Sequence, residues 1–572
     1  MTAGRVVRVN GPLIEVEGLT GVAALDVLEI GDSRLAAEVV SLRDGLVTAQ
    51  AYEYTGGLQV GDGAVGLGHP LSVGLGPGLL GGIFDGLLRP LDRRGTWLTR
   101  EGLGGTGPAT TWRFDPAVTV GSAVGPGSLL GTVAVTGPVQ HRVLVPTGVE
   151  GEVASICGPG EVAEDTPVAR VGDRPVGLVE WWPVRRPRPV RSRLVPSEPL
   201  VTGQRVLDLL YPVAKGGTAA VPGGFGTGKT VLLQQVVKWA DADVIVFVGC
   251  GERGNELADA LAELQALEDA ATGRRLLERT VVIANTSNMP VMAREASIYT
   301  GMTVAEFFRD MGYHAVLLAD STSRWAEALR EFSSRSGELP AEEGYPAGLA
   351  SALAAFYERA GVVRTLGGAP GSVTAIGAVS PPGGDLTEPV TAHTERFVRT
   401  LWSLDRDLAY ARHYPAITWH RSFARDAAAV GDWYATAGQP EWSEHRARAV
   451  ALLADADRLE AVVELVGLPG LPAAERMVLL AGRLVREAVL QQSALSPNDA
   501  TCGPQKQGAL LEAVLAVYDR CCALVASGVA PAEVEGVDFS GLTRVRDETA
   551  ASDAAGVQRR RDEVLGQLGR LS

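Results

Sequence analysis

The segment Ala219–Glu256 reads AAVPGGFGTGKTVLLQQVVKWADADVIVFVGCGERGNE. Residues 223–230 match the pattern G-x-x-x-x-G-K-[S/T] in full, which is the pattern of a phosphate-binding loop. An apolar run before the loop and an amphipathic run after it predict a strand, the loop and a helix in that order. A second apolar run stops at Gly251-Glu252-Arg253. This segment therefore predicts a parallel α/β fold with a phosphate site at its centre.

The loop residues are candidates for nucleotide binding. Glycines free the backbone amides to point inward at the start of the helix, where amides and the helix dipole favour phosphate. The lysine would reach the β- and γ-phosphates, and the final threonine hydroxyl would ligate Mg²⁺. The candidate nucleotide-binding residues are Gly223, Gly224, Phe225, Gly226, Thr227, Gly228, Lys229 and Thr230.

Two carboxylates follow apolar runs that read as buried strands. Asp320 ends the run HAVLLAD, so it is a candidate for the magnesium shell, with a helix cap before Ser321 as the alternative. Glu252 follows the run DVIVFVG, and ligands of open α/β sheets bind beyond the carboxyl ends of strands. There it could orient and polarise an attacking water. Arg253 could neutralise developing charge, or pair with Glu252 or Glu256.

The pattern of the chain changes along its length and predicts several domains. Short alternating runs separated by turn residues indicate a β-barrel, and a second β-rich region resembles lipoyl and biotinyl carrier domains but lacks the lysine that they modify. A proline- and arginine-rich linker leads to alternating strands and helices, and long amphipathic stretches follow. The predicted domains are 1–71, N-terminal β-barrel; 72–109, start of the nucleotide-binding region; 110–185, inserted β-rich bulge; 186–430, P-loop (RecA-like) parallel-sheet domain; and 431–572, helical domain.

Composition narrows the classes of function. At 572 residues the chain is too long for one core, and its formal charge of −15 opposes the broad basic surface that nucleic-acid binding needs. Five cysteines without metal-ligand spacing indicate reduced thiols in a cytosolic protein. Neither a signal peptide nor a run of eighteen apolar residues is apparent, so we expect neither secretion nor a membrane span.

Six motifs together resemble the catalytic A subunit of V-type (V/A-type) rotary ATPases, and the resemblance runs essentially from end to end. It includes the inserted β-domain, which distinguishes A subunits from F-type β subunits. The motifs are GGFGTGKT (223–230), VGCGERGNE (248–256), IANTSNMPVMAREASIYTGMTVAEFFRDMG (283–312), LLADSTSRWAEALRE (317–331), AVSPPGGDLTEPVT (378–391) and YPAITW (414–419).

The resemblance implies an enzyme that binds ATP or ADP with Mg²⁺ and couples hydrolysis or synthesis to ion transport, taken to be proton transport, through a separate membrane sector. It implies an alternating A3B3 hexamer with a non-catalytic B subunit, central-stalk and peripheral-stalk subunits, no nucleic acid, and a cytoplasmic location peripheral to the membrane. Carried over residue by residue, it assigns Lys229 and Thr230 to phosphate and magnesium, Glu252 to water activation, Arg253 and Arg324 to phosphate contacts, Asp320 to the magnesium shell, and Tyr414 to adenine packing. An ordinary core aromatic is the alternative for Tyr414.

Two positions depart from the family. Thr227 stands where many eukaryotic A subunits have a cysteine, so their proposed redox switch cannot operate here. The region LVGLPGLPAAERMVL retains only Glu475 where related rotors often have a more acidic loop facing the stalk.

There are two rival functions, the first also an enzyme and the second from another class of protein. One is a homohexameric P-loop motor, either an export ATPase or an RNA helicase, and the inserted β-domain and the acidic balance argue against it. The other is a non-catalytic nucleotide-binding subunit, and the presence of both Lys229 and Glu252 argues against that.

Overall fold

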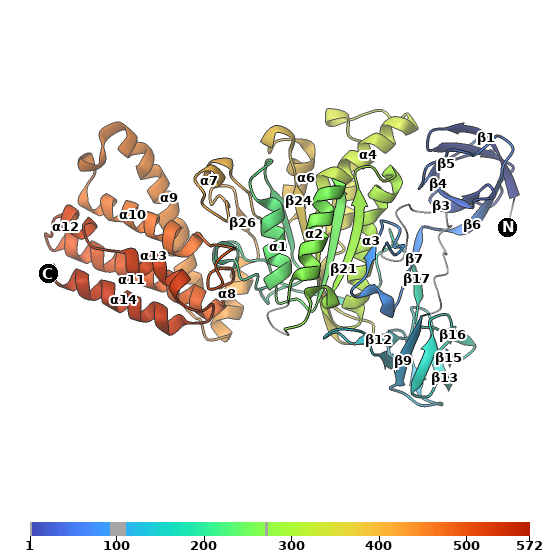
Figure 1. Ribbon diagram of the computed structural model, residues 1–572, viewed down its shortest axis with the longest axis horizontal. Coiled ribbons are helices and arrows are strands. Elements are labelled where there is room, and N and C mark those ends of the chain that lie inside the picture. The colour runs from blue at the N-terminus through green and yellow to red at the C-terminus, as the bar shows by residue number, and fades with distance from the viewer. Residues whose placement is uncertain (1–2, 92–109, 269–272, 572) are drawn as a thin grey trace. The chain divides into compact units, whose positions relative to one another are not determined.

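The computed structural model describes residues 3–91, 110–268 and 273–571, and residues 92–109 of the predicted 72–109 segment lie outside this range (Figure 1). The chain forms two compact units, and each is assembled from separate stretches of sequence. The first contains Met1–Val195, Ala242–Ser380 and Thr387–Phe397, and the second contains Pro196–Asp241, Pro381–Leu386 and Val398–Ser572. Within the described residues, no helix is both long enough and apolar enough to cross a membrane.

The N-terminal strands of the first unit close into a six-stranded antiparallel barrel in the order β1-β2-β5-β4-β3-β6. Alternate residues point inward, and Val6, Ile14 and Leu28 lie in a core that is almost fully buried. The predicted barrel is thus confirmed. Its strands are β1 (Ala3–Asn10), β2 (Leu13–Glu17), β3 (Asp26–Ile30), β4 (Leu35–Arg43), β5 (Leu46–Ala51) and β6 (Gly63–Pro70).

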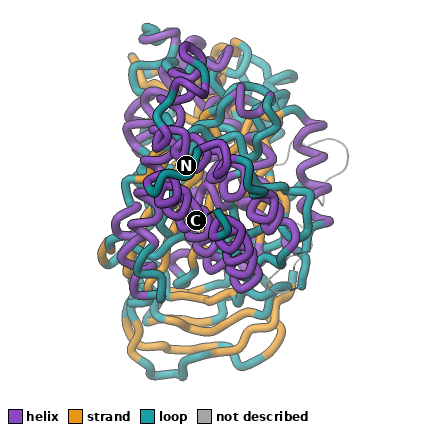
Figure 2. Tube along the Cα trace, turned by 90° about the vertical axis from the view of Figure 1, so that its left-hand side faces the viewer, coloured by secondary structure: helices purple, strands orange, loops and turns teal. Residues whose placement is uncertain are grey.

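Two four-stranded sheets form the inserted β-rich part of the first unit, in the orders β10-β13-β15-β16 and β12-β11-β9-β14. They share a core around Phe114, Leu130 and Val153, and Figure 2 shows their strands in orange at the bottom of the view. The strands are β9 (Thr111–Pro116), β10 (Ala123–Val124), β11 (Leu129–Val133), β12 (His141–Leu144), β13 (Gly151–Ile156), β14 (Gly160–Ala163), β15 (Ala169–Val171) and β16 (Arg174–Val176).

The segment after this insertion, predicted as a linker, is anchored through its arginines. Arg185 donates to Glu38 at 2.6 Å and also pairs with Glu295. Arg188 donates to Asp310 at 2.6 Å and to Glu180 at 2.7 Å. These partners come from the barrel, from β17 (Glu180–Pro183) and from helix α3 (Val291–Asp310), so the ion pairs tie the segment to the rest of the first unit.

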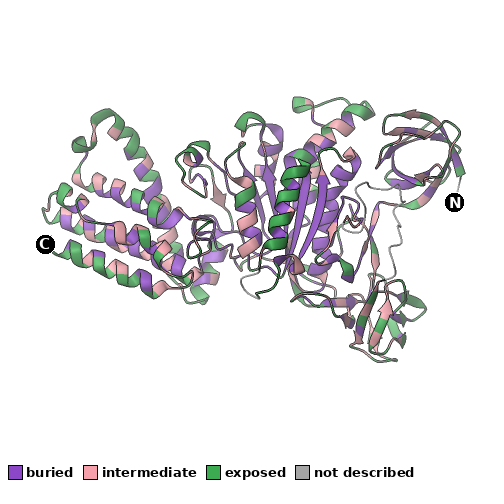
Figure 3. Ribbon diagram, in the orientation of Figure 1, coloured by how far each residue is buried: buried purple, intermediate pink, exposed green. Residues whose placement is uncertain are grey.

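A parallel sheet in the order β24-β22-β20-β21-β8 forms the centre of the first unit. Its central strands are buried, as Figure 3 shows in purple, because helices such as α3 pack against them. Its elements, with the strands that flank it, are β7 (Ser72–Leu75), β8 (Ile83–Phe84), β17 (Glu180–Pro183), β18 (Ser192–Leu194), β20 (Val244–Glu252), α2 (Gly254–Ala266), β21 (Thr280–Thr286), α3 (Val291–Asp310), β22 (His314–Asp320), α4 (Thr322–Ser336), α5 (Leu349–Tyr357), β23 (Gly361–Arg364), β24 (Pro370–Val379) and α6 (Pro389–Phe397).

The second unit joins the strand and helix that flank the phosphate-binding loop to the C-terminal helices. Strand β19 pairs in parallel with β25, and β25 pairs antiparallel with β26. The predicted helical region is confirmed. The elements are a π-helical turn, η2 (Val206–Leu210); β19 (Thr218–Pro222), α1 (Lys229–Trp239), β25 (Thr400–Leu401), α7 (Arg406–Tyr410), β26 (Phe423–Ala424), α8 (Ala427–Thr436), α9 (Trp442–Val466), α10 (Ala473–Leu484), a second π-helical turn, η7 (Val485–Leu490); and α11 (Pro504–Ala526), α12 (Pro531–Glu535), α13 (Ser540–Glu548) and α14 (Ala554–Gly569).

Candidate nucleotide site

The glycine-rich loop of the second unit connects β19 to α1, as the sequence predicts. Gly226 and Gly228 have φ values of +78° and +91°, which side-chain-bearing residues rarely adopt. At Gly223, an added Cβ would lie 2.7 Å from the Cβ of Leu404 and 2.8 Å from Oγ1 of Thr227. Glycine is therefore required at these positions, and the loop places its amides at the start of α1.

The side chains of the loop have distinct environments. Lys229 Nζ donates to the carbonyl of Gly223, and it lies 3.4 Å from that of Gly224. Thr227 is 2% exposed, and its hydroxyl donates to the Gly224 carbonyl at 2.9 Å. Phe225 is 98% exposed, so only its backbone can contribute to the loop conformation. Lys229 and Thr227 thus brace the loop through the carbonyls at its start.

Tyr414 lies beside this loop and is not a core aromatic. It is 44% exposed, and its ring lies 3.8 Å from the place where a Cβ on Gly228 would stand. Its hydroxyl donates to the Ala409 carbonyl at 3.2 Å, and its own carbonyl accepts from the N–H of Gln492 at 2.7 Å. The alternative of an ordinary core residue is wrong, because the ring presents a half-exposed face next to the phosphate-binding loop.

The first unit carries the second group of candidate residues at the ends of neighbouring strands. Glu252 is the last residue of β20, and Asp320 is the last residue of β22, which pairs with β20 in parallel. Asp320 is 6% exposed, and Ser321, not Asp320, caps α4 by accepting from the N–H of Arg324. The helix-cap alternative for Asp320 is therefore wrong, and its carboxylate lies at a strand end next to the strand that carries Glu252.

The two candidate arginines of the first unit both pair with acidic residues. Arg324 Nη1 lies 3.0 Å from each carboxylate oxygen of Glu327, one turn further along α4. Its Cβ would be 2.6 Å from a Cβ on Gly251, so Arg324 packs against the turn that precedes Glu252. Arg253 is largely exposed and lies 3.9 Å from Glu256. Of the two roles open for Arg253, pairing with Glu256 is the one seen in this structure.

The carboxyl of Glu252 is harder to ionise than that of an ordinary glutamate. Its pKa is raised to about 7, first by burial and then by the nearby carboxylates of Asp320 and Glu256, while the Arg324 guanidinium opposes the rise. A general base works best when its pKa lies near the working pH. Glu252 therefore has the protonation behaviour that proton transfer at neutral pH requires.

This arrangement predicts a pH dependence. Because a base must be ionised to act, we expect kcat/KM for ATP hydrolysis by the assembled enzyme to fall as the pH drops below about 7. Glu256→Gln removes one carboxylate that raises the pKa, so it should move the midpoint to lower pH. Glu263→Gln, at an exposed position further along α2, serves as the matched control. An unchanged midpoint in Glu256→Gln would show that Glu252 does not control the profile.

One contact of this region has no signal in the local sequence. Gln492 follows η7, 78 positions beyond Tyr414 in the numbering, yet its N–H bonds to the Tyr414 carbonyl. In the sequence Gln492 stands between Gln491 and Ser493, and no local pattern sets it apart. The loop, Tyr414 and Gln492 belong to the second unit, and Glu252, Asp320, Arg253 and Arg324 to the first.

Comparison with known proteins gives the family. The V-type ATP synthase alpha chain of Anaeromyxobacter sp. (strain K) is 51% identical, over 92% of each chain. The corresponding chain of Nitrosococcus oceani is 47% identical over 99% of this chain and 98% of that one, and the A subunit of the A-type ATP synthase of Desulfurococcus sp. (strain SY) is 48% identical over 93% of each. The chain belongs to the family of V-type alpha chains and A-type A subunits.

Matches to domain families agree with this assignment. They are the ATP synthase alpha/beta family beta-barrel domain at 6–68, the alpha/beta subunit barrel-sandwich domain at 107–185, the alpha/beta family nucleotide-binding domain at 203–424 and the C-terminal domain of V and A type ATP synthase at 431–532. The family resemblance and the multidomain α/β fold predicted from the motifs are thus confirmed.

A solved structure supports the fold alone. The assembled ATPase EscN of the enteropathogenic E. coli type III secretion system aligns with a TM-score of 0.64 at 23% identity, covering 90% of this chain and 100% of that one. Such a secretion ATPase is one of the rival functions considered from the sequence. The full-length relatives at 47 to 51% identity favour the ATP synthase assignment over it.

Proposed function

We propose that the chain is the catalytic subunit of a rotary V/A-type ATPase, which hydrolyses or synthesises ATP. The observation that carries the proposal is that one chain combines a complete phosphate-binding loop with Glu252, a carboxylate whose pKa is raised to about 7 at the end of a parallel strand. A chain that only binds nucleotide has no use for such a base. The family membership supports the same activity.

The loop would bind the phosphates of ATP or ADP. The amides at the start of α1 point out of the helix end, where the dipole favours negative charge. Lys229 Nζ already lies among carbonyls of its own loop, so it can exchange them for phosphate oxygens of greater charge. Gly223, Gly226 and Gly228 keep the backbone close enough for these contacts.

The family resemblance assigns Thr230 and Asp320 to a Mg²⁺ ion that travels with the nucleotide, and both carry the oxygen donors that this ion prefers. Mg²⁺ takes hard oxygen donors and usually keeps several waters, with only one or two protein groups and the phosphates as further ligands. When bound, the ion would neutralise charge on the β- and γ-phosphates. Thr230 would offer its hydroxyl, and the Asp320 carboxylate would hold a water in the shell of the ion.

Glu252 would act on the water that attacks the γ-phosphorus. Its carboxylate accepts a hydrogen bond from this water, orients it and takes up its proton as the bond to phosphorus forms and the bond to the ADP oxygen breaks. Arg253 and Arg324 would stabilise the negative charge that spreads over the transferred group. Synthesis follows the same steps in reverse.

Tyr414→Ala tests the adenine assignment. Stacking on a base is worth about tenfold in affinity by alanine substitution, and it holds the substrate and the transition state equally. We therefore expect KM for ATP to rise about tenfold with little change in kcat. Steady-state kinetics of the assembled enzyme measures both. Tyr410→Ala, at a neighbouring tyrosine that is 70% exposed, is the control, and a pure kcat defect in Tyr414→Ala would place Tyr414 in another role.

The proposed assembly contains other chains. We propose a non-catalytic B subunit that alternates with this chain in an A3B3 hexamer, central-stalk and peripheral-stalk subunits, and a membrane sector that carries the coupled ions, taken to be protons. The chain would then work on the cytoplasmic face of the membrane. Its formal charge of −15 does not favour nucleic acid as a further partner.

Purification tests this assembly. The chain, expressed together with the products of its neighbouring genes, should be recovered with a second type of chain in a 3:3 ratio and should hydrolyse ATP only when Mg²⁺ is supplied. Native mass spectrometry gives the ratio. A ring made of this chain alone, active without the other subunits, would instead favour the homohexameric motor.

A further inference from the structure

Gln492 is buried in the second unit, and both polar atoms of its side-chain amide make hydrogen bonds. It is 3% exposed. Its Oε1 accepts from the N–H of Arg205 at 2.8 Å, and its Nε2 donates to the carbonyl of Gly203 at 2.8 Å. Both contacts lie on the short segment that leads into η2, so the side chain joins the start of this unit to the residues that follow η7.

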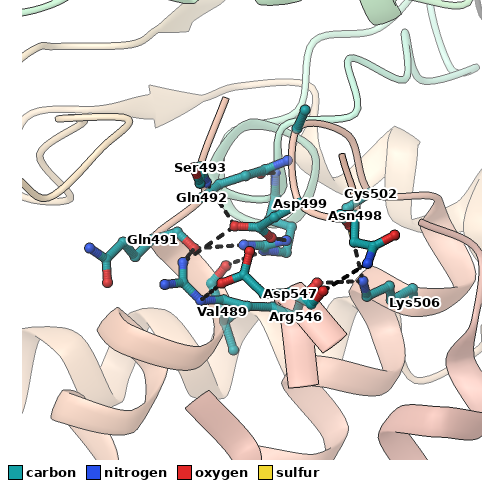
Figure 4. A network of polar contacts seen from close by, with 12 residues as sticks. Val489, Gln491, Gln492, Ser493, Asn498, Asp499, Cys502, Lys506, Arg546 and Asp547 are labelled. Atoms are coloured by element: carbon teal, nitrogen blue, oxygen red, sulfur yellow. Dashed lines mark hydrogen bonds and ion pairs between the residues drawn. The ribbon is translucent and has the colours of Figure 1, made fainter. Parts of the chain in front are cut away.

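A fully buried ion pair holds the residues on either side of Gln492. The Arg205 guanidinium donates to Asp499 at 2.6 Å and to the carbonyl of Gln491 at 2.6 Å. Asp499 accepts from the N–H of Ser493 at 2.7 Å. Figure 4 shows this bond as a dashed line from Ser493 to Asp499. The neighbours of Gln492 are thus fixed by a charge pair that water cannot reach.

Further contacts brace this pair from the helical region. Arg546 from α13 also donates to the Gln491 carbonyl and lies 3.5 Å from Asp499. The Arg205 Nε donates to the Val489 carbonyl at 2.6 Å, at the end of η7. Because a buried charge is tolerated only when its hydrogen bonds are satisfied, these contacts restrain the backbone of residues 489–493.

The backbone of Gln492 contacts the candidate adenine residue. Its backbone N–H donates to the carbonyl of Tyr414 at 2.7 Å. The Tyr414 ring in turn lies next to Gly228 of the phosphate-binding loop. A continuous set of hydrogen bonds therefore runs from the Arg205–Asp499 pair through Gln492 to the backbone that carries the ring.

We propose that Gln492 is a positioning residue for Tyr414, and that the Arg205–Asp499 ion pair sets the place where the Tyr414 ring meets the adenine base. This inference rests on the proposed function, because it takes Tyr414 as the adenine contact. It adds that the binding of the base depends on a network that joins the segment before η2 to residues 489–499.

Gln492→Ala removes the two side-chain bonds and frees the backbone of residue 492 to shift. Loss of one or two such hydrogen bonds corresponds to a rise of about threefold to tenfold in KM for ATP, with kcat nearly unchanged. Kinetics of the assembled enzyme measures this split. The control is Gln505→Ala, which truncates an exposed glutamine at the start of α11. Gln492→Met keeps the length of the side chain and replaces Gln492→Ala if that variant does not assemble.

A double variant separates positioning from a purely structural role. If Gln492 acts through Tyr414, Gln492→Ala should add nothing to the KM of Tyr414→Ala. Additive effects on KM, or a lowered melting temperature with an unchanged KM, would overturn the inference. If Tyr414→Ala leaves KM unchanged, the adenine assignment itself fails and this inference fails with it. If Tyr414→Ala raises KM and Gln492→Ala does not, only this inference fails.

Discussion

Glu252→Gln is expected to lower steady-state ATP hydrolysis by about 10²- to 10⁴-fold, the usual effect of losing a positioned base. Glutamine has the same size and can still contact a water, but it cannot take up a proton. Glu252 is the candidate because burial, Asp320 and Glu256 raise its pKa to about 7. The measurement is kcat of the assembled complex at saturating MgATP, alongside the equilibrium affinity for MgATP, which should stay within about threefold of the unchanged chain.

Lys229→Ala should change nucleotide affinity, in contrast to Glu252→Gln. It removes the charge that meets the phosphates, so it should weaken nucleotide binding itself, whereas Glu252→Gln should leave binding largely intact. Near-normal turnover in Glu252→Gln would reject its role as the base. Unchanged ATP affinity in Lys229→Ala would count against the assignment of the loop.

A second large effect is expected from the partner chain. The transition state of phosphoryl transfer carries dispersed negative charge, and an arginine supplied in trans contributes about 10³- to 10⁵-fold. In this chain Arg324 already pairs with Glu327 at 3.0 Å, and Arg253 lies 3.9 Å from Glu256, so the positive charge of both is partly offset. We therefore expect the isolated chain to bind MgATP but hydrolyse it about 10³-fold or more slowly than the complex, as measured by phosphate release.

The sequence predicts the strands of this fold well, and for a physical reason. Runs such as HAVLLAD and DVIVFVG are short and apolar, and the second is rich in β-branched residues, which suits strands buried on both faces. The phosphate-binding loop is predicted equally well, because Gly226 and Gly228 have positive φ angles that few other residues adopt.

The parts that the sequence does not predict depend on distant partners. Arg205 pairs with Asp499, 294 positions away in the numbering, and no local pattern announces such a contact. Arg185 and Arg188, in the segment predicted as a linker, likewise pair with carboxylates that are distant in the sequence. Tyr414 could be read as core or as ligand contact, and only its 44% exposure beside Gly228 separates the two.

Asp320 shows how far the local sequence can predict the start of a helix. Sequence allows either Asp320 or Ser321 to cap α4, because both residue types are good caps. The structure gives the cap to Ser321, whose hydroxyl accepts from the Arg324 N–H, and leaves Asp320 as the last residue of a strand. A difference of one residue in the start of a helix thus decides whether a carboxylate caps that helix or ends the strand next to β20.

The most direct test of the catalytic assignment is a titration of the cognate B subunit into this chain, with ATPase rate and native mass followed in the same samples. We expect the chain alone to bind MgATP with little turnover, and activity to rise with the appearance of the alternating hexamer rather than with total protein. A chain that hydrolyses ATP alone at the full rate of the mixed complex would contradict it, because its site would then be complete without a partner.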